Sequence, residues 1–161
     1  MSCEYHFIGG LQSNKLRKII EKFDVIQTLD KYEHASKIQL ICEAQDRIMS
    51  CYIEINIQNN PNRRGILENS VISFAKQVIQ YKNIKVLGIM TLAPFFDDIE
   101  KARPYFKKMV KINQDLKDCL GNKYGGFLSM GMSRDFEIAI EEGADLIRIG
   151  QAFFGQRTNQ N

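Results

Sequence analysis

Two small polar corners near the end of the sequence have the residue types that bind a phosphate group. Residues 131–133 read Gly-Met-Ser between an apolar run and a helical pattern, and residues 150–151 read Gly-Gln after the next apolar run. Backbone N–H groups and the Ser133 hydroxyl could therefore donate to an oxyanion at the positive end of a helix. A purely structural alternative makes Ser133 the N-cap of that helix, with Asp135 and Glu137 complementing its first turn. The pairing of two such corners favours the phosphate-binding interpretation.

Arg148 supports the same interpretation. It lies within the short apolar segment "LIRIG", where burying a guanidinium is costly unless it meets an anion or another acceptor. Strand alternation places Arg148 on the same face as Leu146 and Gly150. We therefore expect Arg148 to have a functional role beside the phosphate corner.

Other candidate residues carry weaker signals. Asn14, in "GGLQSNK", could bond to a ligand or only to its own loop, and Lys15 could be a solvated helix lysine. His6 is expected to be a satisfied core residue, whereas His34, among charged neighbours, is expected to be exposed on a helix. The four cysteines have neither CxxC spacing nor a nearby histidine pair, so buried or inert thiols are expected rather than zinc ligands or disulfides.

Short apolar runs alternate with amphipathic segments along the whole chain. Strands are predicted at residues 5–10, 25–30, 50–57, 84–92, 127–131 and 145–150, and helices at residues 11–23, 31–47, 66–82, 99–120, 134–144 and 151–155. The alternation, without hairpin signals, predicts a parallel α/β sheet that is either open and doubly wound or part of a β/α barrel. Both architectures bind ligands at the carboxyl ends of their strands, where the two corners lie.

Helical spacing also predicts which side chains face inward. In the second helix the inward stripe consists of Ala35, Ile38, Leu40 and Ile41. In the third, the apolar residues that recur at near-helical spacing are Ile66, Val71, Phe74, Ala75 and Val78. Pro104 is expected to interrupt the first turns of the longest helix.

Length and composition exclude several classes of protein. The chain has 161 residues, 44% of them apolar and 25% charged, which is typical of one globular domain spanning residues 1–161. Its net charge of +3 comes from interspersed lysines, arginines and acids, so nucleic-acid binding is disfavoured. No apolar window is long enough for a membrane span and no signal peptide is evident, so a cytoplasmic location is expected. Serine-hydrolase, zincin, P-loop and Rossmann motifs are absent.

Three segments resemble the YggS/PROSC family of pyridoxal phosphate homeostasis proteins: "HFIGGLQSNK", "GIMTLAP" and "LSMGMSRDFEIAIEEGADLIRIGQAFFGQR". The resemblance implies the fold of the alanine racemase N-terminal domain, a TIM-type (β/α) barrel that binds pyridoxal 5′-phosphate without established catalytic turnover. It implies that Ser133 and the backbone of Met132, Gly150 and Gln151 hold the phosphate. Arg148 would lie near the pyridine ring, and Asn14 would line the pocket.

The chain also departs from the family pattern. Gln151 stands where the family usually has threonine or serine, and Arg63-Arg64-Gly65 stands where it has a Lys-Ser-Gly-like sequence. The family's first two βα units, with the Schiff-base lysine in an "AVSK"-like motif, have no counterpart here.

These departures imply an incomplete barrel of about six parallel strands. They also imply that the protein is not an enzyme and that it binds the cofactor non-covalently. Truncation, a split gene or decay would each explain them. The alternatives for function are a non-catalytic piece that completes its barrel with another chain, through its exposed edges, or a racemase-type enzyme.

Overall fold

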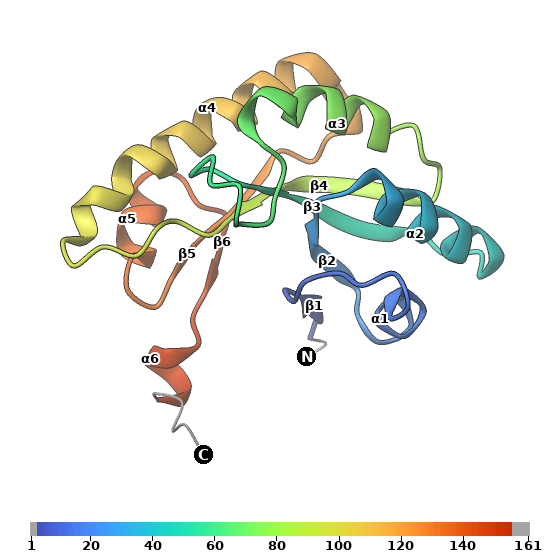
Figure 1. Ribbon diagram of the computed structural model, residues 1–161, viewed down its shortest axis with the longest axis horizontal. Coiled ribbons are helices and arrows are strands. Elements are labelled where there is room, and N and C mark those ends of the chain that lie inside the picture. The colour runs from blue at the N-terminus through green and yellow to red at the C-terminus, as the bar shows by residue number, and fades with distance from the viewer. Residues whose placement is uncertain (1–2, 156–161) are drawn as a thin grey trace.

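The computed structural model describes residues 3–155, which contain one six-stranded sheet. Its strands lie in sequence order and every neighbouring pair is parallel. The strands are β1 (His6–Phe7), β2 (Val25–Leu29), β3 (Met49–Ile55), β4 (Ile84–Thr91), β5 (Phe127–Met132) and β6 (Leu146–Arg148). Figure 1 shows the sheet bent into an arch, open between β1 and β6. The predicted incomplete barrel of six parallel strands is confirmed.

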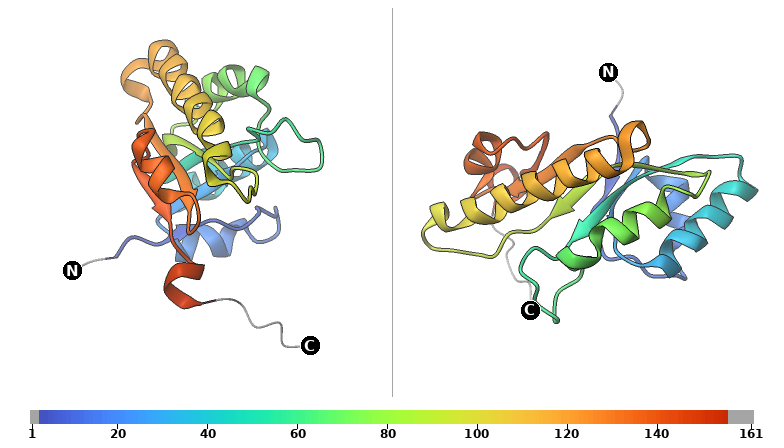
Figure 2. Two further views of the ribbon diagram at one scale, coloured as in Figure 1. Left: turned by 90° about the vertical axis from the view of Figure 1, so that its left-hand side faces the viewer. Right: turned by 90° about the horizontal axis from the view of Figure 1, so that it is seen from above.

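A helix follows each strand of this arch. The helices are α1 (Leu16–Lys22), α2 (Tyr32–Ala44), α3 (Val71–Val78), α4 (Arg103–Leu120), α5 (Phe136–Glu141) and α6 (Gln151–Phe154), with 3₁₀ turns η1 (Glu68–Ser70), η2 (Ile99–Ala102) and η3 (Gly121–Lys123). Helices α1 to α5 lie along the outer side of the arch, whereas α6 follows the last strand, β6 (Figure 1). Figure 2 shows α2, α3 and α4 side by side over the sheet. No helix within residues 3–155 is long and apolar enough to cross a membrane.

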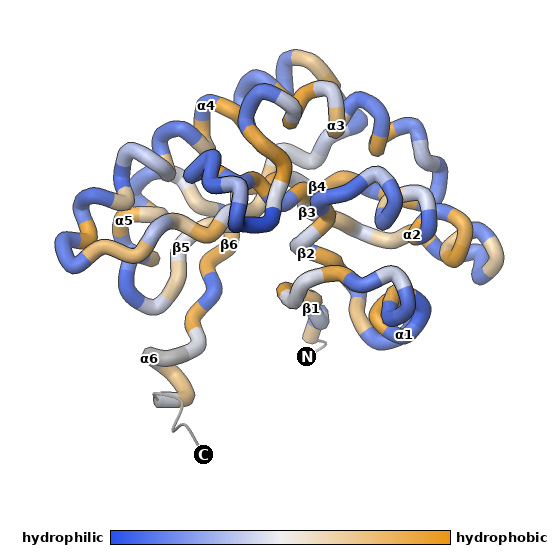
Figure 3. The backbone as a smooth tube through the Cα atoms, viewed as in Figure 1, coloured by the Kyte–Doolittle hydropathy of each residue, from blue (hydrophilic) through white to orange (hydrophobic). Residues whose placement is uncertain are grey.

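The two faces of the sheet have different cores because side chains alternate along each strand. On β3, Cys51, Ile53 and Ile55 belong to the main hydrophobic core beneath the helices. Tyr52 instead packs with Val25 and Met90 in a small cluster on the inner side of the arch. Figure 3 shows alternating hydrophobic and hydrophilic stretches on α3 and α4, as expected for helices covering one side of a sheet.

The arch is bent strongly enough for distant strands to touch inside it. Ser129 Oγ on β5 donates to Gln27 Oε1 on β2 at 2.6 Å, although β3 and β4 separate these strands in the sheet. This contact joins polar side chains of two strands that are not neighbours in the sheet.

Three expectations about individual residues were wrong. Leu40 is 66% exposed, because it lies about 200° around the helix from Ile38, whereas Ala35, Ile38 and Ile41 are buried. Ile66 was expected within the third helix; it instead precedes α3 and forms a parallel bridge with Ile55, although its side chain still packs against the main core.

His34 is the third of these, with only 5% of its surface exposed. Its Nδ1 lies 3.4 Å from Asp30 Oδ1, at the carboxyl end of β2. Pro104 does not interrupt a helix, because η2 ends before it and Pro104 lies in the first turn of α4, where no N–H is required.

Candidate functional site

A cavity of about 690 Å³ lies at the carboxyl ends of β4, β5 and β6. Four of the six predicted site residues line it: Met132, Ser133, Arg148 and Gly150. Leu92, Phe95 and Ile99 contribute apolar wall. The tertiary structure thus brings together segments that are distant in the sequence, at the edge of the sheet where the topology predicts a ligand.

The two other predicted residues differ in position. Asn14 is exposed in the turn before α1 and lines neither this cavity nor the smaller one described below. Gln151 opens α6 directly after Gly150, and its side chain is not among the groups that the structure describes.

The two small corners meet through a hydrogen bond. The Gly150 N–H donates to Ser133 Oγ at 3.2 Å and so joins the loop after β6 to the loop after β5. Ser133 is not the N-cap of α5, because Asp135 occupies that position. The Asp135 carboxylate accepts from the Met132 N–H at 2.7 Å, so this backbone donor already has a protein acceptor.

Gly131 shapes the first corner. Its φ of +92° is a conformation that favours glycine, and a Cβ there would lie 2.6 Å from the Cβ of Ala139 on α5. The backbone can therefore turn tightly against α5 only with glycine at this position.

Arg148 on β6 is held in place by two acceptors, one on β5 and one on β4. Its Nη1 donates to Ser129 Oγ at 2.6 Å, and its Nη2 donates to the Thr91 carbonyl at 2.7 Å. Burial lowers the pKa of Arg148 to about 10, while the carboxyl groups of Asp135 and Glu54 oppose that shift. The guanidinium therefore remains positively charged at neutral pH and lines the cavity.

A chain of hydrogen bonds continues from Arg148 across the inner face. Ser129 donates to Gln27, and Gln27 Nε2 donates to His6 Nδ1 at 2.8 Å. The His6 Nε2 lies 3.0 Å from a Glu4 carboxylate oxygen. His6 is thus a half-buried residue with partners on both ring nitrogens, in keeping with the expectation of a satisfied histidine.

Glu54 on β3 is a residue that sequence reasoning missed. It is only 7% exposed, and its Oε2 accepts no hydrogen bond from the described part of the chain. Burial and the neighbouring Asp30 raise the pKa of Glu54 to about 7, although Arg64 and Arg148 oppose the shift. An acid alternating with apolar residues in "CYIEINI" was the available signal, and it is the same signal that pointed to Arg148.

Glu54 opens onto a second hollow beside the main cavity. This hollow of about 370 Å³ is lined by Glu54, Asn56 and Arg64 among others, and it shares Arg63 and Leu92 with the larger cavity. Positively charged side chains therefore occur at both ends of the combined space.

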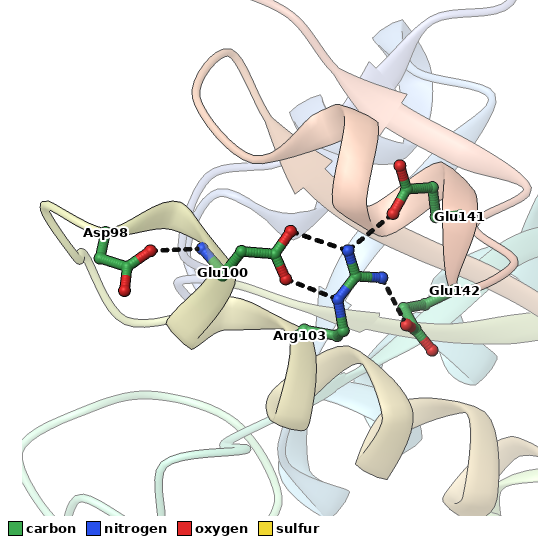
Figure 4. Close-up of polar contacts among 5 residues, drawn as sticks. All are labelled: Asp98, Glu100, Arg103, Glu141 and Glu142. Carbon is green, nitrogen blue, oxygen red and sulfur yellow. Dashed lines mark hydrogen bonds and ion pairs between the residues drawn. The ribbon is translucent and has the colours of Figure 1, made fainter.

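Arg103 joins η2, which borders the cavity, to α5, the helix that follows the Gly131–Ser133 corner (Figure 4). Its guanidinium bonds to Glu100 on η2 and to Glu141 and Glu142 at the end of α5, each with a distance of 2.7 Å. The bond from Arg103 lowers the pKa of Glu100, and Asp98 accepts from the Glu100 N–H at the start of η2. These contacts hold η2 and α5 in fixed relative positions.

Comparison with known proteins identifies relatives over nearly the whole chain. Residues 2–158 match the family of the alanine racemase N-terminal domain. The pyridoxal phosphate homeostasis protein of Aquifex aeolicus is 37% identical over 160 residues, covering 98% of this chain and 68% of the relative. That of Haemophilus influenzae is 35% identical over 164 residues, covering 100% of this chain and 69% of the relative.

Solved structures show the same fold. PipY of Synechococcus elongatus with pyridoxal phosphate bound has a TM-score of 0.86 and 28% identity, covering 96% of this chain and 72% of PipY. Alanine racemase of Clostridium difficile has a TM-score of 0.75 at 17% identity, covering 99% of this chain and 41% of the racemase, and this likeness shows the fold alone. The chain therefore belongs to the family of pyridoxal phosphate homeostasis proteins, which have the fold of the alanine racemase N-terminal domain.

Proposed function

We propose that this chain binds pyridoxal 5′-phosphate reversibly in the 690 Å³ cavity and takes part in intracellular homeostasis of that cofactor, without catalytic turnover. The observation that carries the proposal is the meeting of Ser133, Arg148 and Gly150 at one cavity. The names of the relatives and the cofactor bound to PipY support the choice of ligand.

The cavity fits the cofactor in size and in the chemistry of its lining. Small-molecule sites usually measure about 300–1,000 Å³ and combine apolar walls with a few polar groups. Leu92 and Ile99 offer apolar surface for a ring, and the corner with Arg148 offers donors for a phosphate and its negative charge. When bound, the cofactor supplies an aldehyde that condenses with primary amines and a ring that withdraws electrons.

Each residue has a separate role in this proposal. Ser133 and the backbone at Gly150, Met132 and Gln151 would hold the phosphate, with the Gly150 and Met132 N–H groups exchanging their present acceptors, Ser133 Oγ and Asp135, for phosphate oxygens. Arg148 faces the ring, held by its bonds to Ser129 and Thr91. Asn14, which the resemblance placed in the pocket, lies in the exposed turn before α1 and outside both cavities, so it has no role in this proposal.

No described residue that lines either cavity is a lysine, which supports non-covalent binding. Borohydride reduction of the complex followed by mass analysis should therefore leave no specific lysyl adduct. A stoichiometric adduct on Lys15 would contradict this part of the proposal.

Equilibrium dialysis with pyridoxal 5′-phosphate tests the site. A hydrogen bond to a charged group contributes about 1.5–3 kcal/mol, so Ser133→Ala should weaken binding about tenfold or more. Ser73→Ala is the matched control, because the Ser73 hydroxyl donates only to the Ser70 carbonyl of its own helix turn. Equal affinity of the wild-type protein and Ser133→Ala would refute the phosphate corner.

A second candidate function is assembly with another chain that closes the barrel. It is favoured by the open edges of the arch, where β1 and β6 each pair with one neighbour, and by the exposed side chains of Tyr5 and Ile8 near β1. Light scattering at rising protein concentration tests it. A monomer throughout, with no complex on addition of a candidate N-terminal fragment, would argue against such assembly. Detection of amino-acid racemisation would instead favour a racemase-type enzyme.

A further inference from the structure

Glu54 faces the inside of the arch, next to the proposed ligand cavity. Its register partner on β4 is Met90, which lines that cavity. Tyr52, two residues earlier on the same strand, packs on the inner side with Met90. The carboxyl of Glu54 therefore lies between the inner cluster and the carboxyl edge of the sheet.

The fold itself does not use the Glu54 Oε2 atom. The two cations that act on Glu54 are arginines, but Arg148 donates to Ser129 and Thr91, and Arg64 packs its guanidinium against the backbone of Gly10. Neither arginine forms an ion pair or hydrogen bond with Glu54, which interacts with them only at longer range. A buried carboxylate oxygen without a donor is costly to retain, so its most direct use is to accept from a ligand.

The chemistry of the surroundings specifies what kind of ligand group fits. No described lining residue of either hollow is a lysine, so no protein ammonium lies beside Glu54. Asp30 adds a second negative charge nearby. A small cationic donor on the ligand would be attracted by both carboxylates and would satisfy the Oε2 atom.

We propose that Glu54, which lines the smaller hollow adjoining the ligand cavity, is a specificity-determining residue that makes the site prefer the amine form of the cofactor, pyridoxamine 5′-phosphate, over forms with an uncharged group at the same carbon. The inference rests on the proposed function, because the phosphate corner must bind the rest of the same ligand. The ammonium of the amine form donates to a carboxylate, whereas an aldehyde has no donor and a hydroxymethyl group has no charge.

The charge state of Glu54 adds a second, independent readout. Burial and the nearby Asp30 raise the pKa of Glu54 to about 7. Arg64 and Arg148, the other charged groups that act on this carboxyl, partly oppose that rise. The carboxyl becomes increasingly anionic between about pH 6 and about pH 8. Preference for the amine form should therefore increase over this range.

The experiment compares pyridoxamine 5′-phosphate with pyridoxine 5′-phosphate, which carries a neutral hydroxymethyl group and has no reactive aldehyde. Calorimetric titration at about pH 8 should show the amine form binding the wild-type protein about tenfold or more tightly. Glu54→Gln should remove most of this ratio while retaining affinity for the pyridoxine form. Glu43→Gln, an exposed glutamate on the outer side of α2, is the matched control and should keep the wild-type ratio.

Each outcome separates this inference from the proposed function. Equal binding of the two forms by the wild-type protein, or an unchanged ratio in Glu54→Gln, overturns the role of Glu54 but leaves cofactor binding intact. Failure of both forms and of pyridoxal 5′-phosphate to bind overturns the proposed function as well. If Glu54→Gln does not fold, the pH profile of the wild-type ratio decides, and a flat profile from about pH 6 to about pH 8 refutes the inference.

Discussion

Replacing Glu54 with glutamine should remove one component of the pH dependence of folding stability. In the folded chain the pKa of Glu54 is about 7, against an ordinary value of 4.5. Because the folded state raises this pKa, ionisation is disfavoured there, and stability is lost as the pH rises from the unfolded value through the folded one. At low pH, where the carboxyl is protonated in both states, the penalty is absent.

The magnitude follows from the two pKa values. Ionising Glu54 in both states costs the folded protein about 3 kcal/mol, and about 2.5 kcal/mol of that penalty develops between about pH 5 and about pH 8. The side chain is almost fully buried, so solvent screening reduces this figure little. In Glu54→Gln the side chain is neutral throughout, and this loss of stability should disappear.

Urea unfolding followed by circular dichroism at a series of pH values measures the effect. The informative quantity is the difference in unfolding free energy between variant and wild type, which should become more favourable to the variant as the pH rises. Glu43→Gln again serves as control and should track the wild type. Parallel pH profiles for the wild-type protein and Glu54→Gln would refute the assignment of a buried, unpartnered carboxyl.

Three further predictions concern the framework of the site. Gly65→Ala should lower the free energy of unfolding in urea by about 2–4 kcal/mol, because φ is +107° and a Cβ would lie 2.5 Å from the backbone nitrogen of Asn56. Gly143→Ala is its control: φ is +95° there but no atom beyond its chain neighbours lies within 4 Å of a Cβ, so it should cost only about 1–2 kcal/mol. Arg148→Met should lower the unfolding free energy by about 1–3 kcal/mol, because it leaves a buried carbonyl on β4 without its donor, and unchanged stability would contradict that bond. Arg103→Met should lower the melting temperature at low ionic strength, and the difference from wild type should shrink in about 1 M salt; a salt-independent difference would show that the three glutamate contacts are not its origin.

Much of the architecture could be predicted from local patterns. The alternation of β-branched runs with amphipathic segments indicated six parallel strands, since the main-core side chains of β3 and α3 repeat at the periods of strand and helix. That Ser133, Gly150 and Arg148 line one cavity could be expected from the sequence, because small or charged residues at strand ends are not required by ordinary core packing. Periodicity was less reliable at Leu40 and His34, where the position around a single helix decides burial.

Only the tertiary structure decided which polar side chains on the inner face of the arch find hydrogen-bond partners. The curl of the sheet brings Ser129 of β5 against Gln27 of β2, and this side-chain contact joins residues 102 positions apart. The same curl supplies Arg148 with two protein acceptors and leaves Glu54 with an unused oxygen. The amino-acid sequence alone determined which strands form and which residues end them, because those properties depend on local spacing. Which polar groups find partners depends on the three-dimensional approach of separate strands, and no local pattern encodes that distance.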